Sequence, residues 1–267
     1  WLPAMTSRIS NLQRLAQTIG TVEVADFHRW SVKNRTAFWD LMCDHLQIDF
    51  RGSRGLSWRD GHWYPDAQLN IAANCLKPSA DNNQPAIVYR DQMDGPLSSV
   101  SRDDLSKLAY AVAAHCRSRG LNPGARVALY LNMTVEAIAA YLGVILAGCV
   151  AISIADSFAP PQVALRLRIT GAAMAIVSAD TYNRLLQAGP SLETIVIGNL
   201  PNGNQLRPTD TPWESLTSKV PTEAVICSSA AHTNVLFSSG TTGEPKAIPW
   251  THLTPIKCAA DALLLHD

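Results

Sequence analysis

An alternation of predicted strands and helices over residues 126–197 constrains the fold more than any other feature of the chain. Apolar segments rich in β-branched residues have the length of strands, and segments with helical periodicity separate them. The strands are predicted at 126–131, 149–154, 173–177 and 194–197, and the helices at 134–147, 160–170 and 181–188. Such an alternation with short connections is typical of parallel strands covered by helices. We therefore predict an α/β fold with mostly parallel sheets covered by helices.

The residues before this alternation form two predicted parts. Helical patterns at 7–19 and 34–46 precede a stretch at 50–65 without any period, which predicts an irregular surface segment. A polar stretch at 78–85 indicates a domain boundary, with one part at 1–84 and the other at 85–267.

The second predicted part also has clear local signals outside the alternation. Asp94-Gly95 predicts a β-hairpin, and Ser101 caps a helix that ends near residue 120. Residues 247–250 are extended and edge-like because they contain a proline, and Thr251 is expected to cap a helix that runs to about residue 265.

Residues 137–155 are an uncharged run of 19 residues, which is close to the length of a membrane span. Gly143 and Gly148 interrupt the run, and its end is β-branched. A helix, a tight turn and a buried strand explain it, so we predict no membrane span. With 22 basic and 22 acidic residues, the net charge of zero argues against nucleic acid as a partner. The widely spaced cysteines indicate reduced thiols and an intracellular location.

A hydroxyl- and glycine-rich loop follows the apolar residues 234–237. Its candidate ligand-binding residues are Ser238, Ser239, Gly240, Thr241, Thr242, Gly243 and Lys246. Successive backbone N–H groups in such a turn form an anion-binding concavity, to which the lysine adds a full positive charge. Short hydroxyl donors, bare amides and one lysine suit a polyphosphate.

Two interpretations of this loop follow from its residues and their spacing alone. The P-loop of nucleotide hydrolases requires Gly-Lys-Ser/Thr before a helix, whereas here Glu244 and Pro245 follow Gly243, and Ala247 follows the lysine. A purely structural turn also fits the glycines, although a turn requires neither four hydroxyls nor a lysine.

A third interpretation comes from a resemblance. Ser-Ser-Gly-Thr-Thr-Gly-Glu-Pro-Lys at 238–246 resembles the AMP-binding signature of the adenylate-forming superfamily. Residues 132–148 resemble the strand–helix element of the same family. Residues 29–31, 38–39 and 63–76 resemble the N-terminal region of acetyl- and acetoacetyl-CoA synthetases, so we interpret 1–84 as that segment. Residues 153–158 and 244–251 are most similar to the plant peroxisomal acyl-activating subgroup.

The resemblance implies an ATP-dependent acyl-CoA ligase that uses ATP, Mg²⁺ and coenzyme A. A carboxylic acid would be activated as acyl-AMP and then transferred to the thiol of coenzyme A. The four hydroxyls of the loop would hydrogen-bond the β- and γ-phosphates, Gly240 and Gly243 would shape the loop, and Lys246 would tether it or neutralise phosphate charge. The chain has Ala247 where the family usually has glycine.

The resemblance also implies that this chain is an N-terminal fragment. The family's adenine-binding loop, magnesium-binding glutamate, ribose-binding aspartate and adenylation lysine are expected beyond residue 267, so we assign no catalytic or metal-binding residue within the chain. The missing C-terminal half would then be a partner of this part. The alternatives are a non-catalytic fragment or interaction protein that retains only a phosphate loop, and, for the substrate, an acetate–CoA ligase. The peroxisome and the cytoplasm stay open as compartments.

Overall fold

The computed structural model describes residues 9–55, 58–78, 84–90, 94–189, 191–201, 205–216, 223–238 and 243–266. These residues belong to two compact units. Residues 70–227 and 231–251 form the larger unit, and residues 1–69, 228–230 and 252–267 form the smaller one. The predicted boundary between 84 and 85 stays a prediction, and residues 79–83 of the predicted linker lie outside the described residues.

The larger unit is built on a sheet that has seven strands within the described residues, in the order β10-β9-β8-β6-β7-β12-β13. The strands are β6 (Arg126–Leu131), β7 (Val150–Ala155), β8 (Met174–Ser178), β9 (Glu193–Ile197), β10 (Thr211–Pro212), β12 (His232–Ser238) and β13 (Lys246–Thr251). Their pairings are parallel except for β12 with β13, which is antiparallel at the edge. The predicted α/β class with a mostly parallel sheet is confirmed.

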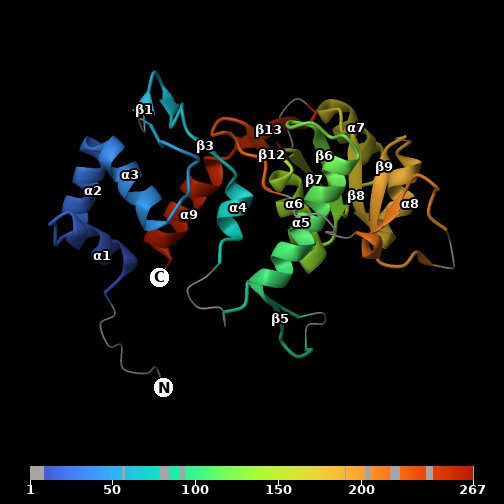
Figure 1. Cartoon of the computed structure of the whole chain (residues 1–267), viewed down its shortest axis with the longest axis horizontal. Coiled ribbons are helices and arrows are strands. Elements are labelled where there is room, and N and C mark those ends of the chain that lie inside the picture. Colours follow the sequence, from blue (N-terminus) through green and yellow to red (C-terminus); the bar gives the residue numbers. More distant parts are fainter. Residues whose placement is uncertain are drawn as a thin grey trace. The chain divides into compact units, whose positions relative to one another are not determined.

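Helices cover both faces of this sheet (Figure 1). On one face, α6 (Val135–Leu146) packs beside α5 (Arg102–Ser118), whose N-cap is Ser101 as predicted. The other face carries α7 (Pro160–Thr170) and α8 (Ala179–Gln187). The unit also contains α4 (Ile71–Cys75), a one-turn 3₁₀ helix at Trp213–Ser215, and a hairpin of β4 (Ile87–Tyr89) and β5 (Ser98–Val100). This hairpin confirms the prediction from Asp94-Gly95.

The main hydrophobic core of the larger unit lies between the sheet and the α7–α8 layer. Alternate residues of β6 and β7 enter it, among them Tyr130 and Ile152, and they pack against Val163 and Leu167 of α7 and Leu185 of α8. Because side chains alternate along a strand, the residues between them face α6 instead. Both sheet faces are therefore buried, which explains why β6 and β7 are continuous apolar runs in the sequence.

The smaller unit is mainly helical. Its elements are α1 (Asn11–Thr18), α2 (Val24–Lys33), α3 (Arg35–His45), α9 (Thr254–Leu265) and the short strands β1 (Trp58–Arg59), β2 (His62–Trp63) and β3 (Gln68–Leu69). Its core contains Leu15 of α1, Phe27 of α2, Met42 of α3 and Ala260 of α9. The remaining strand, β11 (Cys227–Ser228), has residues in both units.

Two local expectations from the sequence are corrected, and one helix had not been predicted. Residues 58–63, expected to be irregular, form an antiparallel hairpin in which Asp60 and Gly61 take positive φ angles of 51° and 83°. These angles are typical of the same Asp-Gly turn that predicted the later hairpin. Helix α2 had not been expected. The last helix begins at Thr254 and not after Thr251, because Thr251 still pairs with His232 in the sheet.

The run at 137–155 is divided between α6 and β7, as predicted. Among the described residues, no helix has the length and apolar character that a membrane span requires.

Candidate phosphate-binding site

The chain connectivity identifies the edge of the sheet at which a ligand is expected. The connection from β6 through α6 leads to β7, whereas the connection from β7 through α7 returns across β6 to β8. Because such crossovers are right-handed, α6 and α7 lie on opposite faces of the sheet. In open parallel sheets, ligands bind at the carboxyl ends of strands beside such a switch in direction. Here that place is the carboxyl end of β6 and β7, with β12 next to β7.

The predicted phosphate loop starts at this edge. Ser238 is the last residue of β12, and β12 runs parallel to β7, so both strands end on the same side of the sheet. Lys246, the first residue of β13, lies directly opposite Ser238 in the antiparallel pair. The loop is therefore the turn of a hairpin whose two ends are fixed by strand pairing, and Lys246 is exposed there.

Three of the predicted site residues can be placed. Ser238 and Lys246 are brought together as partners, and Gly243 has a φ of +93° with no atom within 4 Å of the position that a Cβ would occupy. Such a φ favours glycine, as the loop-shaping role requires. Ser239, Gly240, Thr241 and Thr242 lie outside the described residues, so their predicted contacts with phosphates stay predictions.

Arg166 is a residue at this edge that had not been singled out from the sequence. Its guanidinium lies 3.9 Å from the ring centre of Phe158, just after β7, and 5.2 Å from that of Phe237 near the end of β12. The residue is only 8% exposed, and burial lowers the pKa of its guanidinium. Arg166 could have been found from the sequence, because it is an arginine on the same helical face as the buried residues Val163, Leu167 and Thr170.

Hydrogen bonds also fix the loops after β6, β7 and β8. Tyr130 donates from its hydroxyl to the Phe158 carbonyl at 2.6 Å, and Asn132 donates from Nδ2 to Oδ2 of Asp180 at 3.0 Å. Burial would raise the pKa of Asp180, but hydrogen bonds from Asn132 and Ser178 outweigh it and the pKa is lowered. The loops at the carboxyl edge are thus linked to one another by polar contacts.

An apolar hollow of about 410 Å³ opens beside the same strand ends, on the α6 face. Its lining includes Leu129 and Leu131 of β6, Ile138 and Tyr141 of α6, and Ser153 of β7. A hollow of this size and character accepts an apolar group of a ligand or of a neighbouring polypeptide segment.

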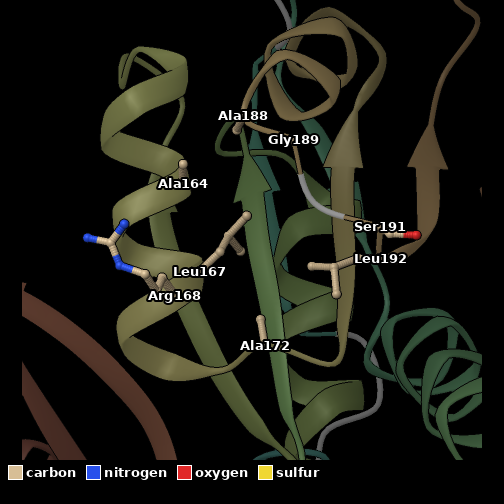
Figure 2. A pocket seen from close by; sticks show the side chains of 8 residues that line it. All are labelled: Ala164, Leu167, Arg168, Ala172, Ala188, Gly189, Ser191 and Leu192. Carbon is tan, nitrogen blue, oxygen red and sulfur yellow. The ribbon is translucent and has the colours of Figure 1, made fainter.

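A second hollow of about 270 Å³ lies elsewhere in the larger unit, between the end of α7 and the segment that leads into β9 (Figure 2). It is lined by Leu167, Ala172 and Leu192, residues that precede the starts of β8 and β9, while the Arg168 guanidinium points away from the other lining side chains. The hollow therefore lies at the amino ends of the strands, opposite the edge at which ligands of parallel sheets bind.

The helix expected after Thr251 would place His252 in its first turn. His252 lies two residues before α9 and is 1% exposed. Burial lowers its pKa from 6.5 to about 4, so the imidazole is neutral at physiological pH.

The lowered pKa of His252 predicts acid sensitivity of the fold. The unfolded chain binds a proton at this residue below pH 6.5, whereas the folded chain binds it only near pH 4. Its contribution to stability is therefore complete above pH 6.5 and falls as the pH falls toward 4. We expect the free energy of unfolding of the wild type to fall by about 2 kcal/mol between pH 7 and pH 4.5 because of this residue. His252→Gln should abolish this part of the pH dependence, and urea unfolding at both pH values measures it. The control is His45→Gln, at an exposed position, which should keep the pH dependence of the wild type. Equal effects of the two substitutions on the pH dependence of stability would contradict the assignment.

The described part of the chain contains no group of three or more His, Cys, Asp or Glu side chains placed to hold a metal ion. The groups that fit a nucleotide are those of a phosphate site: an exposed lysine, a glycine at positive φ and a buried arginine.

Taken together, the sheet and this edge define an α/β protein with a candidate phosphate-binding loop between β12 and β13, beside the switch in strand direction. Residues 77–264 match the family model described as AMP-binding enzyme, and residues 24–75 match the one described as acetyl-coenzyme A synthetase N-terminus. The chain therefore belongs to the AMP-binding enzyme family.

Individual relatives agree with this membership. The chain is 33% identical to "Probable acyl-activating enzyme 18, peroxisomal" of Arabidopsis thaliana, over 98% of this chain and 41% of that protein. It is 35% identical to "Hexanoyl-CoA synthase" of Cannabis sativa, over 88% of this chain and 37% of that protein. The structure of acetoacetyl-CoA synthetase from Streptomyces lividans matches with a TM-score of 0.84 and 25% identity, over 98% of this chain and 44% of that one. The chain thus spans less than half the length of these relatives.

Proposed function

We propose that this chain forms the phosphate-binding part of an ATP-dependent acyl-CoA ligase. One observation carries the proposal: the loop at 238–246 begins at the carboxyl end of β12, beside the switch in strand direction, with Lys246 fixed opposite Ser238. Membership of the AMP-binding enzyme family supports the reaction class, as do relatives named hexanoyl-CoA synthase and acetyl-coenzyme A synthetase.

The proposed reaction has two steps. A carboxylate oxygen of the acid attacks the α-phosphate of ATP, which gives acyl-AMP and releases pyrophosphate. The sulfur of coenzyme A then attacks the acyl carbon, the thiol proton leaves, and AMP departs. In the first step negative charge accumulates on phosphate oxygens, so positioned donors and cations lower the barrier.

The residues of this chain act on the phosphates. Lys246 supplies positive charge at the mouth of the loop, and Gly243 lets the backbone turn so that its N–H groups approach phosphate oxygens. Ser238, Ser239, Thr241 and Thr242 are proposed to donate hydrogen bonds to the β- and γ-phosphates. Magnesium, when bound with ATP, neutralises phosphate charge; the described residues offer it no carboxylate cluster, so we assign it no ligand in this chain.

The proposed substrate is a small-molecule carboxylic acid, together with ATP and coenzyme A. The names of the relatives hexanoyl-CoA synthase and acetyl-coenzyme A synthetase indicate a range of chain lengths for this acid. Acetate is the alternative to a longer acid. The remaining half of the relatives' length is the proposed partner that completes the site. The names of two plant relatives favour the peroxisome over the cytoplasm as the compartment.

A test of the loop uses Lys246→Ala in the full-length protein. We expect acid-dependent release of pyrophosphate from ATP to fall about a hundredfold or more, because an uncompensated phosphate charge develops in the transition state. Lys107→Ala, which removes another exposed lysine from α5 of the same unit, should change the rate less than about twofold. Turnover of Lys246→Ala at the wild-type rate would refute the role of the loop.

The second candidate function is a non-catalytic fragment or interaction protein that retains only the phosphate loop. The coverage of 37 to 44% of the relatives' lengths favours it for the chain by itself. Calorimetric titration of residues 1–267 with Mg·ATP, after circular dichroism has shown folded protein, separates the two. We expect weak or no binding by this part alone, whereas tight binding with turnover would exclude the second candidate.

A further inference from the structure

Among the residues that the structure describes, Arg166, the buried arginine of α7, has no charged partner. Arg166 donates from Nη1 to the backbone carbonyl of Gln162 at 2.9 Å, but its buried Nε has no hydrogen-bond partner among the residues that the structure describes. No ion pair between Arg166 and a carboxylate is present within these residues either, and desolvation alone accounts for its lowered pKa. A buried charge is ordinarily paired, because removing it from water without a partner is unfavourable.

The position of Arg166 indicates where the missing charge would come from. Its guanidinium lies at Phe158, which follows β7, and near Phe237, the residue before Ser238. Phe237 and Ser238 point to opposite faces of β12, so Arg166 approaches the start of the loop from the α7 face and Lys246 from the other face. The end of β12 thus has a cation on each side.

The two rings hold the guanidinium in one orientation without neutralising it. Aromatic faces attract a cation through their quadrupole, and a planar guanidinium stacks well on them. Neither ring accepts the remaining N–H groups as a carboxylate would. The guanidinium therefore stays able to pair with an anion that approaches it.

We propose that Arg166 supplies the buried positive charge of the phosphate site and that the phosphates of bound ATP, or of pyrophosphate, compensate it. The inference rests on the proposed function and adds a second cation to it. Because the surroundings of Arg166 are poorly solvated, its attraction for a phosphate is stronger than that of an exposed lysine at the same distance.

The proposal predicts opposite effects on binding and on stability. In Arg166→Met a side chain of similar length fills the space between the two rings without a charge. We expect ATP and pyrophosphate to bind roughly ten- to a hundredfold more weakly, as for the loss of a charge-assisted contact. The ligand-free protein should be as stable as the wild type or more stable, because an unpaired buried charge has been removed.

The experiment measures thermal unfolding of the full-length protein without ligand and with pyrophosphate, together with KM for ATP. Arg166→Lys keeps the charge and should restore most of the pyrophosphate-induced shift in the unfolding temperature. Arg168→Met is the control, because Arg168 lies on the same helix and points away from the strands (Figure 2).

The outcomes distinguish the inference from the proposed function. A wild-type shift and a wild-type KM in Arg166→Met would overturn the role of Arg166 and leave the loop assignment standing. If Arg166→Met fails to fold, Arg166→Lys decides: a folded Arg166→Lys without any pyrophosphate shift overturns the role of charge. A wild-type protein that shows neither a pyrophosphate shift nor ATP-dependent activity removes the proposed function, and the inference with it.

Discussion

Replacing Asn70 with aspartate is expected to destabilise the larger unit by about 3 to 5 kcal/mol, since a buried charge is left facing acceptors. Asn70 is 2% exposed, and its Nδ2 donates to the carbonyls of Ile145 at 2.8 Å and Val225 at 2.9 Å. Its Oδ1 accepts from the N–H groups of Ala72 and Ala73 and so caps α4. A carboxylate keeps the cap but turns both donated bonds into contacts between oxygens.

The pH dependence of Asn70→Asp identifies this mechanism. A protonated carboxyl at position 70 can donate one of the lost hydrogen bonds, whereas the carboxylate can donate none. The free energy of unfolding, measured by urea titration, should therefore differ most from the wild type at neutral pH and less under acidic conditions. Asn122→Asp, at an exposed position after α5, is the control and should lie within about 0.5 kcal/mol of the wild type. Equal stabilities of the two variants at neutral pH would show that the hydrogen bonds from Asn70 to these two carbonyls do not stabilise the fold.

Gly143→Ala is the second change with a large expected effect. A Cβ at Gly143 would lie 2.5 Å from the Ala109 carbonyl oxygen and 2.6 Å from Cβ of Val112. Both are atoms of α5, so the two helices must separate or α6 must shift on the sheet. Although alanine is the better helix former by about 1 kcal/mol, we expect a net loss of about 2 to 3 kcal/mol from overpacking.

The matched control for Gly143→Ala is Gly189→Ala. Gly189 has a φ of +82° and open space around it, so alanine there meets only backbone strain of about 1 to 2 kcal/mol. Unfolding by urea, followed by circular dichroism, compares the two. A Gly143→Ala variant more stable than the wild type would mean that helix propensity outweighs the close approach of α5.

These two positions lie near the end of α6, which precedes the amino end of β7, so they affect the candidate site only through the folding of the larger unit. Asn70 ties α4 to the carbonyl of Ile145 at the end of α6, and Gly143 lets α6 lie close to α5. Helix α6 leads directly into β7, which pairs with β12 beside the phosphate loop. Variants at these positions in the full-length protein should therefore lower the amount of folded protein without changing the affinity of the folded fraction for ATP, if ATP binds as proposed.

Local signals were sufficient for most of the larger unit. The βαβ segments, the Asp94-Gly95 hairpin and the Ser101 cap each depend on a few neighbouring residues, so periodicity and turn chemistry predicted them. The hairpin at 58–63 carries the same Asp-Gly signal but lacks flanking apolar alternation, and it was predicted as irregular. The start of α9 was placed too early because pairing of Thr251 with His232, a contact between distant residues, extends β13.

The class of fold, the family resemblance and the loop with Lys246 could be predicted from the sequence, because each signal is contained in contiguous residues. The three-dimensional fold was needed to show that Lys246 lies opposite Ser238, that His252 is buried, and that Arg166 lies without a charged partner among the described residues. Burial and pairing depend on which strand lies beside which, and the order β6-β7-β12 joins residues separated by more than 70 positions. A periodic pattern shows that Arg166 is on the buried side of a helix, but only the fold shows that its guanidinium lies against Phe158 and Phe237, near the start of the proposed phosphate loop.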